Sequence, residues 1–291
     1  MTFRNAVMWM KQRPLLVLLV IICIVDVFIF YVYFHYAHRQ LTVAFLDIGQ
    51  GDAVYIEAPN GNQMLYDAGP PTGAVLRALN DVMPFYDRSI DVAVFSHPDM
   101  DHIGGFLDVF DRYKVDVMLE PGSHSDNGVY DEAEQSIAKH HITRIVAKRG
   151  MTIDMGGGVA ADILYPDRDM SNMETNASSI VMRIHYGDTA FLVSGDLPLA
   201  QENYLVNQDG DTLHAQVLKL GHHGSHTSSG EGWLRAIHPD IAVISAGLNN
   251  RYGHPHKEVL GILDRLGIPY LITFKEGTIK FASDAHSVVR Q

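Results

Sequence analysis

The feature that most constrains the fold of this chain is a group of four possible metal ligands within six residues. They are His97, Asp99, Asp101 and His102, in the segment SHPDMDHIGG that follows the apolar run Val92–Phe95. Carboxylates packed so closely repel each other unless cations lie between them. A polar loop that only caps a helix would need a single Asp. The segment therefore predicts a metal-binding loop between a buried strand and a helix.

Three later segments offer further ligands where apolar runs end. Asp196 closes LVSGD; alone it would be typical of a turn, but together with the first cluster it is a candidate carboxylate bridge between two metals. His222 and His223 leave an apolar run into a glycine-flanked loop, a pattern that favours metal binding. His254 is a candidate ligand or proton donor, whereas His256 is interpreted as a helix cap.

Other polar residues are assigned supporting roles. The glycine-rich turn Asp47–Ala53 is not followed by a helix, so a phosphate-binding loop is not favoured there. Asp67 ends another apolar run, and we expect it to orient a ligand or the metal loop by hydrogen bonds. Lys219 and Arg251 are expected to offset charge on a substrate. The remaining histidines considered, which lack such a context, are interpreted as surface or core residues: His124, His140, His141 and His185.

The N-terminal segment 14–36 is apolar and about as long as a helix that crosses a membrane, with Asp26 as its only formal charge. Basic residues precede it at Arg4, Lys11 and Arg13, which predicts that the N-terminus stays in the cytoplasm. A cleaved signal peptide is the alternative, although its apolar region would be shorter. We expect residues 1–13 to be a cytoplasmic N-terminus, 14–36 a single-pass membrane anchor, and 41–291 an extracytoplasmic domain.

Charge limits the partners of that domain. The chain has 22 Lys and Arg against 34 Asp and Glu, a net charge of -12, and the basic N-terminus makes the remainder more acidic still. Nucleic-acid binding relies on clustered Lys and Arg, so it is possible here but not supported by the net charge. An acidic domain can still bind phosphates through metal ions. The single cysteine, Cys23, excludes an intrachain disulfide.

From Leu41 onward, short runs rich in Val, Ile and Phe alternate with amphipathic stretches. Strands joined both by tight turns and by helices are typical of a mixed α/β domain. Hairpins are predicted at residues 55–67 and 180–196, a loop at Met155–Gly158, and a last strand at Tyr270–Phe274. The architecture that fits best is two mixed sheets packed face to face, with helices outside.

The motifs together resemble the metallo-β-lactamase superfamily, in the variant of the hydrolase domain of ComEC-type DNA-uptake proteins and their stand-alone relatives. They are FLDIGQGDA, YDAG, SHPDMDHIGG, NASSIV, SGD, LKLGHHGS and NNRYGHP, and the resemblance covers residues 41–285. It implies an αβ/βα four-layer sandwich, here preceded by one transmembrane helix, with two divalent metal ions at one edge.

The resemblance also implies a ligand set. One metal would be bound by His97 and Asp99, the other by Asp101, His102 and His222, with Asp196 as the bridge. An Asp stands at position 99 where the family has a second His, and Asn176 lies where its third-motif His is expected. These changes make the set oxygen-rich, so it suits Mn²⁺ as well as Zn²⁺.

The sequence thus predicts a metal-dependent hydrolase that attacks a phosphodiester with a metal-bound hydroxide. Asp101, His223 and His254 are the candidate catalytic residues; His254, or His223 if it is free of metal, would protonate the leaving oxygen. One alternative is hydrolysis of a small ester, thioester or lactam, which the acidic composition favours over a polymer. Another is a non-catalytic, membrane-tethered metal-binding module.

Overall fold

The computed structural model describes the backbone of residues 13–37 and 40–291, and the side chains of residues 13–30 and 40–291. The chain divides into two units, residues 1–39 and residues 40–291. The predicted basic residues Arg4 and Lys11 lie outside the described residues.

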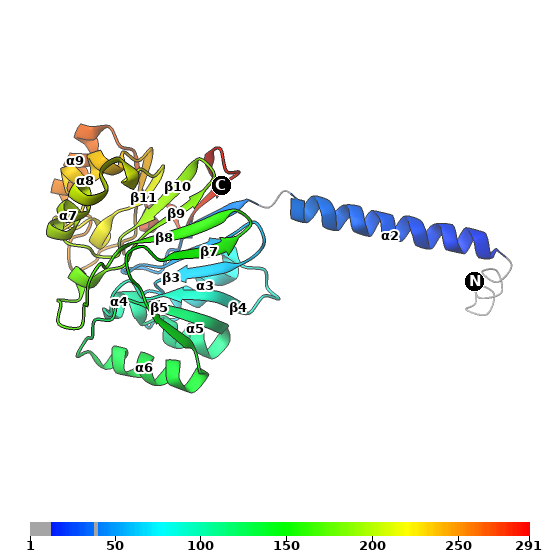
Figure 1. The fold of residues 1–291 in the computed structure, drawn as a ribbon, viewed down its shortest axis with the longest axis horizontal. Helices are drawn as coiled ribbons and strands as arrows, with labels where there is room; N and C mark the ends of the chain where they lie inside the picture. Colours follow the sequence, from blue (N-terminus) through cyan, green and yellow to red (C-terminus); the bar gives the residue numbers. More distant parts are fainter. Residues whose placement is uncertain (1–12, 38–39) are drawn as a thin grey trace. The chain divides into compact units, whose positions relative to one another are not determined.

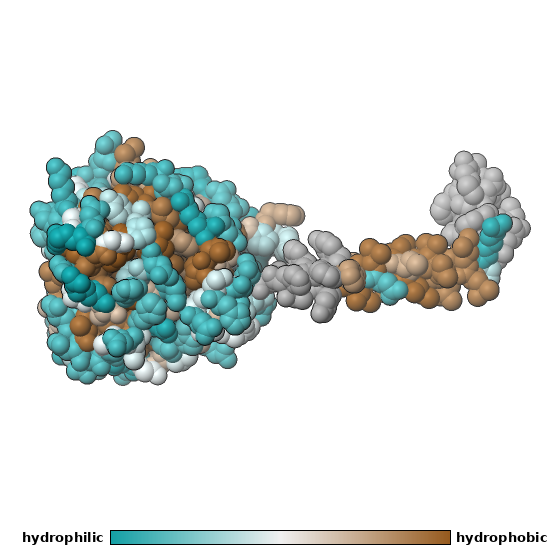
Figure 2. Space-filling model, turned by 90° about the horizontal axis from the view of Figure 1, so that it is seen from above, coloured by the Kyte–Doolittle hydropathy of each residue, from teal (hydrophilic) through white to brown (hydrophobic). Residues whose placement is uncertain are grey.

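The first unit contains helix α2, Pro14–Ala37, over the segment predicted as a membrane anchor. Apart from Asp26, its described side chains are mainly apolar and mostly exposed, as the largely hydrophobic surface in Figure 2 shows. Within the part of the chain whose side chains are described, no helix reaches the length and apolar character needed to cross a bilayer.

The second unit is built around two mixed sheets (Figure 1). The first has the order β15-β14-β1-β2-β3-β4-β5-β6, and the second β13-β12-β11-β10-β9-β8-β7. In each sheet one half is antiparallel and the other parallel: β3 to β6 run parallel in the first, and β10 to β13 in the second. The strands of the first sheet are β1 Leu41–Phe45, β2 Val54–Glu57, β3 Gln63–Tyr66, β4 Ser89–Val94, β5 Lys114–Glu120, β6 Thr143–Val146, β14 Ile279–Ser283 and β15 Val288–Arg290. Those of the second are β7 Thr152–Gly156, β8 Val159–Tyr165, β9 Val181–Tyr186, β10 Thr189–Val193, β11 Val217–Lys219, β12 Ile241–Ile244 and β13 Tyr270–Ile272.

Helices cover the outer faces of both sheets (Figure 1). The first sheet carries α3 Ala74–Val82, α4 Met100–Ile103, α5 Phe106–Arg112 and α6 Gly128–His140. The second carries α7 Leu199–Asp209, α8 Glu231–Ile237 and α9 Lys257–Leu266, and α10 Thr273–Glu276 follows β13. Three short 3₁₀ segments are η1 Asn176–Ser178, η2 Gly210–Leu213 and η3 Gly221–Gly224.

Side-chain alternation explains why the layers form. In β1, Val43 and Phe45 point into the core between the sheets, whereas Ala44 points into the core under α3, α5 and α6. Successive residues of a strand face opposite sides, so each strand of a central layer contributes to two cores. The predicted sandwich of two sheets with outer helices is therefore confirmed.

Three details differ from the sequence prediction. The last predicted strand, Tyr270–Phe274, ends at Ile272, because Thr273 starts α10 and hydrogen-bonds to Ala246 through its hydroxyl. The loop predicted at Met155–Gly158 is the end of β7 and a tight turn into β8, where three glycines adopt positive φ. Helix α7 was not predicted.

The topology brings many strand ends to one edge. Strands β3 and β4 are parallel, and β1 has the same direction as β3 because both are antiparallel to β2. In the second sheet β10, β11 and β12 are mutually parallel. Ligands of open α/β sheets bind outside the carboxyl ends of such strands. The loops that follow β1, β3, β4, β10, β11 and β12 carry nearly all the candidate site residues.

We predict that the core between the sheets dominates the stability of this unit. Phe191 is fully buried there and meets the ring of Phe281 edge-on, with ring centroids 6.4 Å apart. Phe191→Ala should lower the free energy of unfolding by about 3–5 kcal/mol, as large-to-small core changes do. Urea unfolding of the full chain measures this, with the half-exposed Val289→Ala as control. Equal small losses in both variants would contradict the prediction.

Candidate metal centre

Close backbone packing fixes the loop that follows β4. A Cβ atom at Gly105 would lie 2.0 Å from the carbonyl oxygen of Ala68, so only glycine fits there. A Cβ atom at Gly51, which has φ +126°, would lie 2.2 Å from the carbonyl oxygen of Asp101. The loops after β1, β3 and β4 therefore touch through their backbones, and α4 presents Asp101 and His102 from a rigid position.

Asp196 is the centre of the site. It follows β10, is 3% exposed, and its backbone N–H donates to Ser179 Oγ. Four imidazole nitrogens surround its carboxylate. The Nε2 atoms lie 3.3 Å (His102), 3.5 Å (His222), 3.7 Å (His223) and 3.9 Å (His97) from its oxygens.

The other nitrogen of each histidine already has a protein partner. Nδ1 of His102 lies 2.8 Å from Asp67 Oδ2, and Nδ1 of His97 lies 2.9 Å from Ser96 Oγ. Nδ1 of His223 meets the carbonyl oxygen of Ser245 at 3.0 Å, and that of His222 meets Thr227 Oγ1 at 3.0 Å. Metal-binding histidines are held in this way, with the second nitrogen directed at the ion.

The inward-facing atoms fit a metal centre. Nε2 of His97, His102 and His223 and Oδ1 of Asp196 are buried and make no hydrogen bond within the described part of the chain. Buried polar atoms are normally paired, and unpaired ones are costly. Divalent cations would satisfy these atoms and also offset the repulsion among the carboxylates.

The ligand atoms fall into overlapping groups whose members lie within 4.8 Å of one another: His97, His102 and Asp196; and Asp101, His102 and His223. Asp99 lies beside the first group, with Oδ2 3.7 Å from His97 Nε2. The second group contains His223, whose Nε2 lies 3.4 Å from Asp101 Oδ2. His222, the ligand predicted for that metal, lies beside Asp196 and in neither group.

Burial and neighbouring charge oppose each other at these residues. Burial, helped by His102, lowers the pKa of His97 to about 3. Burial also acts to lower the pKa of His223, but Asp196 and Asp52 outweigh it and raise that pKa to about 9. Burial acts to raise the pKa of Asp101, but its hydrogen bond to His223 and the charge of His102 hold it below the usual range. Cations and protons therefore compete for the same imidazoles.

Asp67 has the orienting role that the sequence predicted. Its backbone adopts φ 59°, and its carboxylate accepts hydrogen bonds from the Ser96 N–H at 2.8 Å and the Ser96 hydroxyl at 2.6 Å, besides meeting His102. Burial raises the pKa of Asp67, although His102 acts in the opposite direction.

Asp52 and Lys219 are the part of the site that the sequence did not reveal. Lys219, predicted to offset substrate charge, is instead fully buried and bonded to the carboxylate of Asp52. Asp52 in turn lies 3.2 Å from His223 Nδ1 and 3.7 Å from His102 Nδ1. Lys219 Nζ also lies 3.4 Å from the carbonyl oxygen of Gly195. Gly51 is the sequence feature that could have pointed to Asp52. Its left-handed backbone lets the turn after β1 enter the site.

His254 stands next to the histidine pair. Its ring centroid is 5.5 Å from that of His222, and its Nδ1 is buried without a hydrogen-bond partner in the described structure. Asn250 holds its backbone at both the N–H and the carbonyl group.

His256 takes the N-cap position of α9, but its side chain does not cap the helix as predicted and contacts His226 and the Tyr252 carbonyl group instead.

A groove of about 510 Å³ adjoins Asp101. Arg251 and Tyr252 line one part of it, and Ile48 and Met100 give it an apolar wall.

Asn176, which lies where the family resemblance implies a histidine, is in η1, and its Oδ1 is buried without a described partner.

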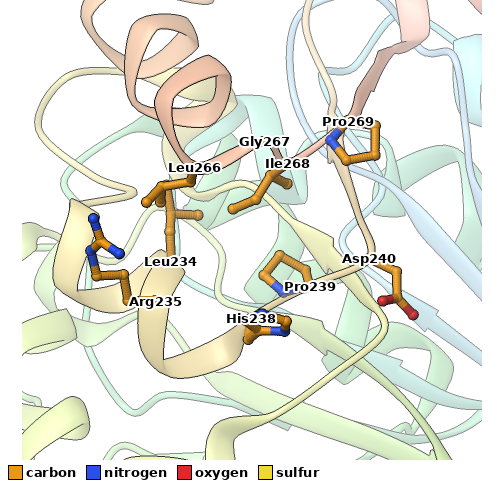
Figure 3. A pocket seen from close by; sticks show the side chains of 9 residues that line it. All are labelled: Leu234, Arg235, His238, Pro239, Asp240, Leu266, Gly267, Ile268 and Pro269. Atoms are coloured by element: carbon orange, nitrogen blue, oxygen red, sulfur yellow. The ribbon is translucent and has the colours of Figure 1, made fainter.

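A separate cavity of about 430 Å³ lies where α8 and α9 end (Figure 3). Its lining contains none of the candidate ligands: Leu234, Arg235, His238, Pro239, Asp240, Leu266, Gly267, Ile268 and Pro269. The candidate ligands therefore gather at the edge that holds Asp196 and not at this cavity.

Comparison with known proteins gives matches to one family of sequences and to one fold. The sequence pattern of the Metallo-beta-lactamase superfamily matches residues 46–247. The chain is 30% identical over 258 residues to ComE operon protein 3 of Bacillus subtilis (strain 168), covering 82% of this chain and 32% of that protein. It is 34% identical over 246 residues to Competence protein ComA of Neisseria gonorrhoeae, covering 83% and 32%. The chain thus spans about a third of the length of these relatives.

Among solved structures, CmlA, a diiron beta-hydroxylase from Streptomyces venezuelae, is similar with a TM-score of 0.51 and 14% identity, covering 87% of this chain and 54% of that one. At that level of identity the likeness shows the fold alone.

We predict that Lys219 is needed because it neutralises Asp52. Lys219→Met leaves a buried carboxylate without its cation, and breaking a buried pair from one side costs about 3–5 kcal/mol. The double variant Asp52→Asn with Lys219→Met removes both charges and should recover part of that loss. Urea unfolding of the full chain measures all three proteins, with the exposed Lys139→Met as control. A double variant no more stable than Lys219→Met would contradict this account.

Proposed function

The chain belongs to the metallo-β-lactamase superfamily, and we propose that it is a metal-dependent hydrolase acting on a phosphodiester. The observation that carries the proposal is the arrangement around Asp196: four histidines hold their Nδ1 atoms in protein contacts and turn Nε2 toward one carboxylate. Such a set has little use in a folded protein other than to bind cations.

We assign two divalent ions, Zn²⁺ or Mn²⁺, to this set. His97, Asp99 and Asp196 would hold one, and Asp101, His102 and His223 the other, with Asp196 shared. His223 replaces the predicted His222 because it lies beside Asp101. Bound divalent ions lower the pKa of water to about 7 and offset charge developing on phosphoryl oxygens.

The chain's own residues prepare the site for that chemistry. Asp67 and the Ser245 carbonyl group hold hydrogens on the Nδ1 atoms of His102 and His223, which leaves the Nε2 lone pairs free. Because Nδ1 of His223 meets the Ser245 carbonyl group and its Nε2 would bind a metal ion, we do not assign it the transfer of a proton. Asp101 is assigned to ligation, where its low pKa keeps it ionised.

His254 is the residue we assign to the substrate. Burial, together with His223 and His222, lowers the pKa of His254 to about 4, so its ring is neutral at pH 7. A neutral imidazole is poorly suited to the predicted donation of a proton to a leaving oxygen, and its low pKa also makes it a weak base. We therefore assign its unpartnered Nδ1 to a hydrogen bond with the substrate or its water. Arg251, at the groove beside Asp101, supplies a cation for an anionic part of the substrate.

Hydrolysis of a small ester, thioester or lactam is the second candidate. The net charge of -12 supports it, because an acidic surface repels polyanions. The same ligand set would serve either substrate, so the two candidates differ in the groove rather than at the metal centre.

For localisation, we propose that α2 is a single-pass membrane anchor that leaves residues 41–291 outside the cytoplasm. Support comes from its exposed apolar side chains, among them Leu15 at 81% and Val27 at 70% exposed. Large apolar surfaces in contact with water are unfavourable. Mass spectrometry of the mature N-terminus tests the proposal, because cleavage that removes α2 would indicate a signal peptide instead.

We predict that Asp101→Ala with His102→Ala abolishes both metal binding and turnover, because these residues supply two ligands of one ion. Metal content is measured by mass spectrometry, and activity on bis-p-nitrophenyl phosphate, single-stranded DNA and a panel of acyl esters with Mn²⁺ or Zn²⁺. The matched control, Asp111→Ala with His140→Ala, removes an exposed Asp–His pair of 3.1 Å and should change neither.

Two outcomes would count against the proposal in different ways. Turnover that survives in the Asp101 and His102 variant would exclude the metal mechanism. Turnover of esters but not of phosphodiesters by the unmodified protein would favour the second candidate, and absence of stoichiometric metal would favour a non-catalytic module.

A further inference from the structure

Glu202 is a buried carboxylate that the metal centre does not use directly. It lies in the first turn of α7, is 1% exposed, and has no cationic partner among the described residues. Its two oxygens accept hydrogen bonds from the backbone N–H groups of Ser229, at 2.6 Å, and Gly230, at 2.9 Å. Burial raises the pKa of Glu202 to about 7, although the N–H groups of Gly230 and Ser229 act in the opposite direction. A buried carboxyl group held only by backbone groups is costly, so its position calls for an explanation.

The loop that Glu202 holds is the one that presents the histidine pair. Ser229 connects Glu202 to Gly221. Its N–H donates to Glu202, and its hydroxyl accepts a hydrogen bond from the N–H of Gly221, at 3.1 Å. Gly221 directly precedes His222 and His223. A carboxylate on α7 is therefore connected through one hydroxyl to the start of the metal-binding turn.

That turn needs outside support. His222 and His223 have φ values of 50° and 55°, and two consecutive non-glycine residues are thus left-handed. Residues other than glycine are disfavoured in this conformation relative to the right-handed form. Ser229 is itself left-handed, with φ 60°. Strained backbone persists only where the surroundings fix it.

Other contacts close the loop but do not replace Glu202. The Ser228 hydroxyl donates to the Leu197 carbonyl group at 2.7 Å, and the His222 N–H donates to the Gly195 carbonyl group at 3.1 Å. Among the described residues, Glu202 alone accepts hydrogen bonds from two consecutive N–H groups where this loop leads into α8. A side chain at Gly221 would lie 3.7 Å from its Oε1, which shows how closely the two segments pack.

We infer that Glu202 is a positioning residue that acts through Ser229 and Gly221. It fixes His223 for the metal ion that His223 would share with Asp101. This inference rests on the proposed function, because it needs a metal ion bound at His223. Residues behind metal ligands typically change metal affinity by about 10–100-fold when they are substituted.

The test is a Mn²⁺ titration of the full chain, followed by electron paramagnetic resonance. Glu202→Gln keeps the shape but sets an amide NH₂ against a backbone N–H, and should weaken Mn²⁺ binding by about 10-fold or more. Ser229→Ala removes only the hydrogen bond to Gly221. It should also weaken Mn²⁺ binding, by a smaller factor than Glu202→Gln. The matched control is Glu120→Gln, a mostly buried Glu paired with Arg144 and outside this loop, which should bind Mn²⁺ like the unmodified protein.

The outcomes distinguish a failure of the proposed function from a failure of the positioning role. If the unmodified protein binds no Mn²⁺ or Zn²⁺, the proposed function fails. If it binds Mn²⁺ and both Glu202→Gln and Ser229→Ala bind equally well, the positioning role is wrong. An equal loss in Glu120→Gln would mean that general destabilisation, not positioning, is the cause. Should Glu202→Gln not fold, Ser229→Ala against Glu120→Gln decides.

Discussion

The convergence of four imidazole Nε2 atoms on the Asp196 carboxylate is the interaction on which the rest of the site depends. These groups come from loops after β4, β10 and β11, in two different sheets, so the sandwich has to be complete before they can meet. Without cations the arrangement leaves several buried atoms unpaired. Packing elsewhere, such as the core at Phe191, holds the strands from which these loops leave.

Behind the histidines lies a second layer that sets their orientation. Asp67 and Asp52 are both fully buried and face the Nδ1 atoms of His102 and His223. Two carboxylates in one interior would destabilise each other, and Lys219 resolves the conflict by pairing with Asp52. Burial acts to raise the pKa of Asp52, but Lys219 and His223 hold it below the usual range, so it remains an acceptor. Lys219 thus offsets one of the two carboxylates of this layer inside the protein.

The sequence predicts the sandwich and most of the site because both depend on local patterns. Apolar runs that end in His or Asp identify strand ends, and parallel strands bring those ends together. It does not predict Asp52, because a glycine-rich turn has many uses and only Gly51 packing on the Asp101 carbonyl group reveals this one. It cannot choose between His222 and His223, since adjacent residues in a left-handed turn point in directions that no periodicity describes. Helix α7 escapes prediction because it buries Glu202 and Leu205 rather than a continuous apolar stripe.

The two proposed ion positions are not equivalent. One is the position proposed at His102 and His223, and it is supported by charge. Both histidines have carboxylates at their Nδ1 atoms, which makes their Nε2 atoms better metal ligands. The other relies on His97, whose Nδ1 meets only the neutral hydroxyl of Ser96, and that hydroxyl already donates to Asp67. Asp99 stands where the family resemblance implies a histidine, and Asn176 where it implies another. The position at His97 is therefore poorer in nitrogen and less polarised, and the two ions would differ in affinity even if they were the same metal.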